Sequence, residues 1–69
     1  MNLVINGEER SFEAEAVGTV GALIEALQIE AKRGVAVAVD DEVVPRSRWE
    51  EAPLRDGSRV EIIRATQGG

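Results

Sequence analysis

The sequence contains no cysteine, no histidine and no tyrosine among its 69 residues. Without cysteine there is no disulfide, no thiolate metal site and no thiol nucleophile. Without histidine, a hydrolytic triad and a histidine–metal site lose their commonest component. We therefore expect no catalytic residue and no metal site, and we interpret the acidic run Asp40-Asp41-Glu42 as a solvated turn. A chain of this length forms one domain at most.

Basic residues are in the minority, with 8 Lys and Arg against 13 Asp and Glu, which gives a net charge of −5. Nucleic-acid binding depends on basic patches, so we expect no nucleic-acid partner. No stretch is apolar for long enough to span a membrane, so we expect no membrane partner. The first residues lack the basic region and the cleavage site of a signal peptide. A cytoplasmic location is therefore the expectation.

The first half of the sequence predicts a hairpin followed by a helix. Asn6-Gly7 follows a short apolar run and is the strongest two-residue hairpin signal, because both positions tolerate positive φ. We predict a β-hairpin over residues 3–12. Thr19 can cap a helix, and apolar residues follow it at the i, i+3, i+4, i+7 spacing of one helix face. A helix is predicted over 20–28, with its apolar face formed by Val20, Leu23, Ile24 and Leu27.

Two short strands follow. Residues 35–39 alternate valine with alanine, so we expect the valines to face the helix and the alanines to face the other way. Asp40-Asp41 predicts a turn, and a second short strand over 42–44 ends at Pro45, because proline cannot donate to a central ladder.

The last part of the chain predicts a helical turn and a final strand. Ser47 and Glu50 form a capping-box pattern, which predicts a short turn that places Trp49 against the sheet. Asp56-Gly57 predicts a turn before a final strand over 58–65.

This order of elements is that of the β-grasp, or ubiquitin-like, fold. We expect an α+β domain with a mixed sheet of about five strands and one main helix on one face. The final strand is expected beside the first, at the sheet centre. The domain is predicted over residues 1–65, which leaves residues 66–69 as a C-terminal tail.

Alternation along the final strand predicts a small apolar patch near that tail. If Val60 and Ile62 face the helix, then Ile63 faces the open side of the sheet, beside Ala36 and Ala38. We interpret this patch as a possible partner surface. The alternative is an exposed isoleucine without a function, which is common on protein surfaces.

The sequence ends in Gly68-Gly69. Glycine has no Cβ, so its backbone can enter a narrow channel and adopt φ angles that other residues avoid. A glycyl carboxylate is also an unhindered acyl group. These properties suit a terminus that another enzyme threads, activates and modifies. The alternative is a frayed end, since termini are often disordered.

Several segments together resemble the ThiS family, the ubiquitin-like sulfur carrier proteins of thiamine thiazole biosynthesis, over essentially the whole length. They are Thr19-Val20 with Leu23 and Leu27, Val37-Ala38-Val39, Val43-Val44-Pro45-Arg46 with Trp49, Asp56-Gly57, and Gly68-Gly69. The most specific is the Val-Val-Pro-Arg-x-x-Trp block followed by a strand and Gly-Gly. The related small subunit of molybdopterin synthase also ends in Gly-Gly, but it is usually longer and lacks this block.

The resemblance implies a carrier and not an enzyme. In such proteins an E1-like adenylating enzyme activates the terminal glycine with ATP, a persulfide enzyme delivers sulfur to form a thiocarboxylate, and thiazole synthase takes that sulfur. The resemblance thus assigns the acyl carbon to Gly69 and tail threading to Gly68 and Gln67. The chain itself is expected to bind no cofactor. Two alternatives stay open: a sulfur carrier for molybdopterin synthesis or tRNA thiolation, and a non-covalent ubiquitin-like binding module.

Overall fold

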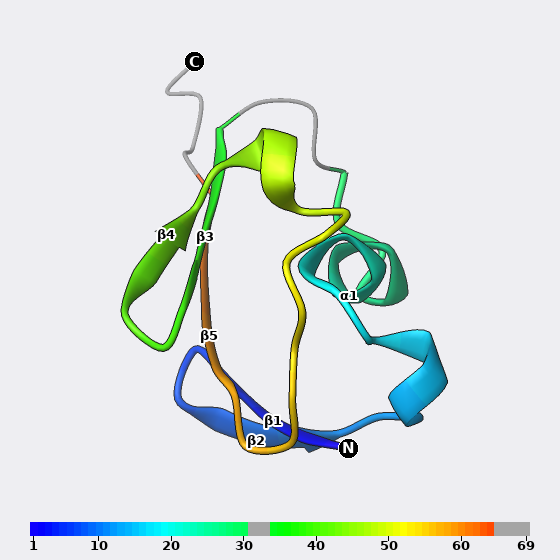
Figure 1. Ribbon diagram of the computed structural model, residues 1–69. Coiled ribbons are helices and arrows are strands. Elements are labelled where there is room, and N and C mark those ends of the chain that lie inside the picture. Colours follow the sequence, from blue (N-terminus) through cyan, green and yellow to red (C-terminus); the bar gives the residue numbers. More distant parts are fainter. Residues whose placement is uncertain (31–33, 65–69) are drawn as a thin grey trace.

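The computed structural model describes residues 1–30 and 34–64 (Figure 1). They form a five-stranded sheet in the order β2-β1-β5-β3-β4, with helix α1 on one face. The elements in chain order are β1 (Asn2–Ile5), β2 (Glu8–Ser11), the 3-10 helix η1 (Ala14–Ala16), α1 (Val20–Ala26), β3 (Val35–Val39), β4 (Glu42–Val44), the 3-10 helix η2 (Arg46–Arg48) and β5 (Arg59–Arg64). β5 pairs parallel to β1 and antiparallel to β3, so the sheet is mixed and the predicted β-grasp arrangement is confirmed.

The local signals for the hairpin and for the start of α1 are confirmed. Asn6 and Gly7 have φ values of 51° and 84°, as a two-residue turn between antiparallel strands requires. Thr19 Oγ1 accepts a hydrogen bond of 3.1 Å from the Ala22 backbone N–H, which satisfies one free donor of the first helical turn.

The core lies between α1 and the helix side of the sheet. Its fully buried side chains are Leu3, Val17, Val20, Leu23, Val37 and Val60. The valines of β3 face the helix as predicted, since Val37 is buried and Val35 and Val39 pack against the core. Trp49 is 5% exposed, and its indole Nε1–H donates to the Val44 carbonyl at 2.9 Å. Trp49 therefore closes the core, and its one polar atom has a partner.

The hairpin strands run over residues 2–11 instead of 3–12. Three further predictions are wrong, each for a local reason. Helix α1 ends at Ala26, because Leu27 caps it and Gln28 adopts a φ of 59° that a helix cannot continue. The helical turn η2 begins before Ser47, directly after Pro45, and has no side-chain cap, so the capping-box prediction fails. β5 begins at Arg59, because Ser58 belongs to a turn in which its hydroxyl accepts from the Arg55 N–H. The 3-10 helix η1 was not predicted.

The predicted end of the domain at residue 65, and the tail over 66–69, lie outside the described residues. Among the described residues, no helix has both the length and the apolar composition needed to cross a membrane.

Candidate functional site

The open face of the sheet carries a small apolar patch next to the end of β5. Ala36 of β3 pairs with Ile63 of β5, and Ala38 of β3 pairs with Val43 of β4. Directly paired residues share one face of a sheet. The side chains of Ile63 and Val43 are 64% and 73% exposed, the largest exposures among the described large hydrophobic residues. We call Ala36, Ala38, Val43 and Ile63 the open-face patch.

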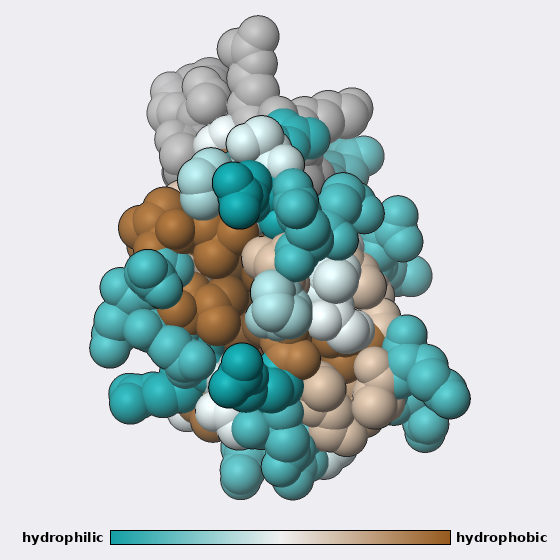
Figure 2. Space-filling view, viewed as in Figure 1, coloured by the Kyte–Doolittle hydropathy of each residue, from teal (hydrophilic) through white to brown (hydrophobic). Residues whose placement is uncertain are grey.

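The structure places three of the patch residues where the sequence predicted them. Ile63 and Ala36 are exposed on the open face, and Ala38 is half-buried there. The role of these residues in binding a partner stays a prediction. In Figure 2, hydrophobic surface gathers on the side of the molecule formed by β3 and β4.

Val43 was missed by the sequence reasoning. Its neighbour Val44 pairs with the buried Val37 and is itself half-buried. Because side chains alternate along a strand, Val43 must then point to the open face. That alternation was the available signal, but two adjacent valines do not reveal which of them faces inward.

The end of β5 is fixed by a side chain from the hairpin turn. The Asn6 backbone N–H donates to the Val60 carbonyl at 2.9 Å, and after it the chain turns away from β5. The Asn6 side chain then continues the ladder: its Oδ1 accepts from the Ile62 N–H at 2.8 Å, and its Nδ2 donates to the Ile62 carbonyl at 3.2 Å. The last two residues of β5, Ile63 and Arg64, therefore follow a clamped residue and stay paired with β3. We call Ile63-Arg64 the tail root.

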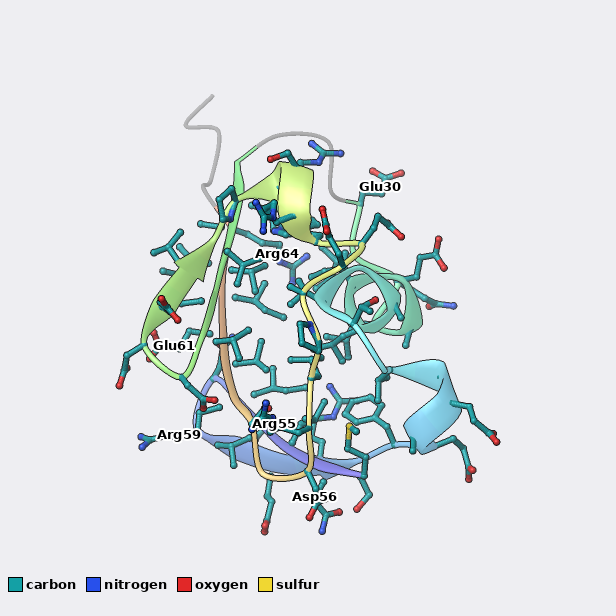
Figure 3. All side chains as sticks on the ribbon, viewed as in Figure 1. Glu30, Arg55, Asp56, Arg59, Glu61 and Arg64 are labelled. Carbon is teal, nitrogen blue, oxygen red and sulfur yellow. The ribbon has the colours of Figure 1, made fainter. Side chains whose placement is uncertain are left out.

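Charged side chains lie along both faces of β5. Figure 3 places Arg59 and Glu61 on the open side of β5 and Arg64 on the side that faces α1. Strand alternation gives the same result, since Val60 and Ile62 are buried on the helix side and Arg64 continues their series. The tail root thus has an apolar patch on one face and a cation on the other.

The acidic run after β3 forms a turn, as interpreted from the sequence. Asp40 and Asp41 have φ values of 50° and 70°, and Asp40 Oδ1 accepts from the Arg59 N–H at 3.0 Å. Within residues 1–30 and 34–64, no group of three or more His, Cys, Asp or Glu residues is placed to hold a metal ion.

Gln67, Gly68 and Gly69 lie outside the described residues. Two roles therefore stay predictions: the threading of the tail through Gln67 and Gly68, and the covalent modification of the Gly69 carboxyl group.

Comparison with known proteins supports one family. The sequence model of the ThiS family matches residues 3–69, which include both terminal glycines. The sulfur carrier protein ThiS of Thermus thermophilus is 37% identical over 65 residues, covering 94% of this chain and 95% of that protein. The sulfur carrier protein ThiS of Escherichia coli is 28% identical over 69 residues, covering the full length of both.

Two further matches extend this finding. A thiazole synthase of Paramagnetospirillum magneticum is 42% identical over 69 residues, but the chain spans only 20% of that longer protein. The crystal structure of the thiamine biosynthesis protein ThiS from Geobacter metallireducens superposes with a TM-score of 0.83 at 29% identity, with both chains covered completely.

Proposed function

The chain belongs to the ThiS family, and from that membership we propose that it carries sulfur for thiazole formation in thiamine biosynthesis. The observation that carries the proposal is the family match over residues 3–69, which includes Gly68-Gly69. The same fold in a solved ThiS structure supports it. We propose that the chain is a protein substrate of its partners and not itself an enzyme.

The proposed chemistry takes place at the Gly69 carboxylate. A carboxylate is a poor acyl donor, so it must first be activated. An E1-like adenylating enzyme joins it to the α-phosphate of ATP, and pyrophosphate leaves. The terminal sulfur of an enzyme persulfide then attacks the acyl carbon and AMP leaves. Cleavage of the resulting sulfur–sulfur bond by a second thiol leaves the Gly69 thiocarboxylate and a disulfide.

The residue content of the chain fits a protein substrate whose partner enzymes supply the catalytic groups. It has no cysteine and no histidine, so the nucleophile and the proton-transfer groups would come from the partners. The adenylating enzyme would supply the ATP site and the stabilisation of the developing charge. This chain would supply a slim acyl terminus and the surfaces that bring it to the right enzyme.

We propose thiazole synthase as the acceptor of the sulfur. The match of this chain to one fifth of a protein named thiazole synthase supports a close link between carrier and synthase. We place the chemistry in the cytoplasm, because the activation step consumes ATP. The open-face patch is the proposed docking surface, since it lies next to the tail root and its isoleucine and valine are largely exposed.

Intact mass spectrometry tests the proposal. The purified chain is incubated with the adenylating enzyme, Mg·ATP and a persulfide-forming sulfur source. The mass should rise by the difference between one sulfur and one oxygen, and fragmentation should place the sulfur on Gly69. The loaded protein should then support thiazole formation when thiazole synthase and its other substrates are added.

Two results would contradict the proposal. Sulfur located on another residue would exclude the terminal thiocarboxylate. An unchanged mass, with an adenylating enzyme that loads the Escherichia coli carrier in parallel, would favour a non-covalent binding module. A loaded carrier that serves molybdopterin synthesis but not thiazole formation would place the chain in another pathway.

A further inference from the structure

A hollow lies beside the tail root, on the face of the sheet opposite the open-face patch. It has a volume of about 220 Å³. Its apolar wall is formed by Ile5, Leu27, Ile29 and Ile62, and its polar lining residues are Asn6, Arg10 and Arg64. Arg64 pairs with Val35, and Arg10 pairs with the buried Leu3, so both arginines belong to the helix side of the sheet. We call this site the arginine hollow.

The arginine hollow differs from its neighbours in charge. No carboxylate lines it. Three other hollows of the described surface each combine an arginine with carboxylates: Arg55 with Asp40 and Glu42, Arg46 with Glu25, Glu30 and Glu50, and Arg48 with Glu51. An ion pair of 3.7 Å joins Arg48 to Glu51, whereas no described carboxylate lies within ion-pair distance of Arg10 or Arg64. Two cations therefore line one hollow on a protein of net charge −5.

Arg10 is also held in position. Its guanidinium carbon lies 5.4 Å from the centroid of the Phe12 ring, in the range of a cation–π contact. A cation–π contact does not use up the N–H donors of a guanidinium, which has five of them. Those donors match a carboxylate in a two-point arrangement. The apolar wall beside them suits an aliphatic side chain next to the carboxylate.

We propose that the arginine hollow receives an acidic side chain, with an apolar neighbour, from the adenylating enzyme. This inference rests on the proposed function. Residues 65–69 span at most roughly 17 Å beyond Arg64, so an enzyme that encloses Gly69 must also lie close to the tail root. The net negative surface of the carrier repels an acidic segment elsewhere. The arginine hollow attracts this acidic segment, and the contact sets the orientation of the carrier on the enzyme.

The geometry gives the enzyme two contacts on opposite sides of one strand. The open-face patch offers apolar area on one face of β5, and the arginine hollow offers charge on the other. Contact on both faces would hold the end of β5 in a fixed orientation on the enzyme.

ATP–pyrophosphate exchange with the full-length carrier tests the inference. Arg10→Met and Arg64→Met remove the charge but keep an unbranched apolar side chain. Each should raise the apparent KM for the carrier roughly tenfold, the loss expected of one hydrogen bond between charged groups, with kcat unchanged. Arg55→Met is the matched control, because it changes net charge equally at the opposite end of β5, and it should leave KM near the wild-type value (Figure 3).

Two further measurements separate recognition from structural damage. Thermal melts should be similar for all three variants, because both hollow arginines are exposed. The wild-type KM should rise with salt, because salt screens the attraction between the arginines and the acidic side chain of the enzyme. The rise should be smaller in Arg10→Met, because this variant has already lost one of the two positive charges. Arg10→Lys should restore part of the loss, since it keeps the charge without the two-point geometry.

Three results would overturn the inference. If Arg10→Met and Arg64→Met had the same KM as Arg55→Met, the adenylating enzyme would not bind the two arginines of the hollow. Normal adenylation combined with impaired sulfur transfer from the preloaded carrier to thiazole synthase would assign the hollow to the other partner. No exchange by the wild-type chain, with an enzyme active on its own carrier, would remove the proposed function and this inference together.

Discussion

The side-chain amide of Asn6 makes two hydrogen bonds to the backbone of Ile62, 56 residues away, one through its oxygen at 2.8 Å and one through its nitrogen at 3.2 Å. An amide side chain both donates and accepts, so it can replace a peptide group in the β ladder. It does so at the point where β1 ends and β5 continues toward the tail. The hairpin turn and the tail root are thereby joined.

Asn6→Gly should destabilise the domain by about 1–3 kcal/mol, because the buried N–H of Ile62 loses its partner. Glycine accepts the positive φ of residue 6, so the turn itself is preserved and the loss reports the side chain alone. Urea denaturation followed by tryptophan fluorescence gives the free energy of unfolding. Asp41→Gly is the control, since Asp41 also has a positive φ, and it should be neutral or slightly stabilising. Equal stability of Asn6→Gly and wild type would contradict the role given to the amide.

Leu23→Ala should cost about 2–5 kcal/mol, since Leu23 is fully buried on the inner face of α1. Leu27→Ala should cost less, because Leu27 caps the helix and is only half-buried. Thermal melts of the two variants give the comparison. If Leu27→Ala were the more damaging change, the helix would make contacts that the structure does not contain.

Ile63→Asp and Val43→Asp should leave stability nearly unchanged, because both side chains are largely exposed. Each should weaken binding to the adenylating enzyme or to thiazole synthase, since the open-face patch would then present a charge. Titration calorimetry with each partner measures this loss. Val60→Asp is the matched control for strand phase and should unfold the domain, because Val60 is 1% exposed on the helix side of β5 and a carboxylate there would be buried without a partner. If Ile63→Asp melted normally and still bound both partners fully, the patch would not be the docking surface.

Adding one alanine after Gly69 should abolish adenylation and leave the fold intact, because the acyl carbon moves and a Cβ is introduced. Gly68→Val should act in the same way by obstructing a narrow channel. ATP–pyrophosphate exchange measures both effects, and a thermal melt confirms that the domain is folded. Undiminished exchange with either variant would remove the steric role proposed for the two glycines.

The sequence predicted the parts of this fold that depend on local chemistry. Asn6-Gly7 predicted the turn, and the alternation around Val60 and Ile62 predicted the open position of Ile63. The end of α1 was missed because glutamine is not a residue type that favours a positive φ, and yet Gln28 adopts one. The Ser47 capping box failed because Pro45 starts the helical turn earlier.

The missed site residues depend on pairing between distant segments. The orientation of Val43 follows from the pairing of β4 with β3 and not from two adjacent valines. Arg10 and Arg64 line one hollow because β5 lies beside β1, which in turn pairs with the strand that carries Arg10. No spacing along the chain brings those two residues together.

The place of β5 also governs when this domain can fold. β5 is the last of the described strands to be synthesised, yet it lies at the centre of the sheet, between β1 and β3. Until residue 64 has left the ribosome, the hairpin of β1 and β2 and the hairpin of β3 and β4 have no strand to join them, and Val37 and Leu3 have no closed core. Long-range pairings of this kind form late and leave apolar surface exposed in the meantime. The open-face patch that we propose for docking includes Ile63 of β5, so a chain that lacks β5 presents neither a closed core nor this patch.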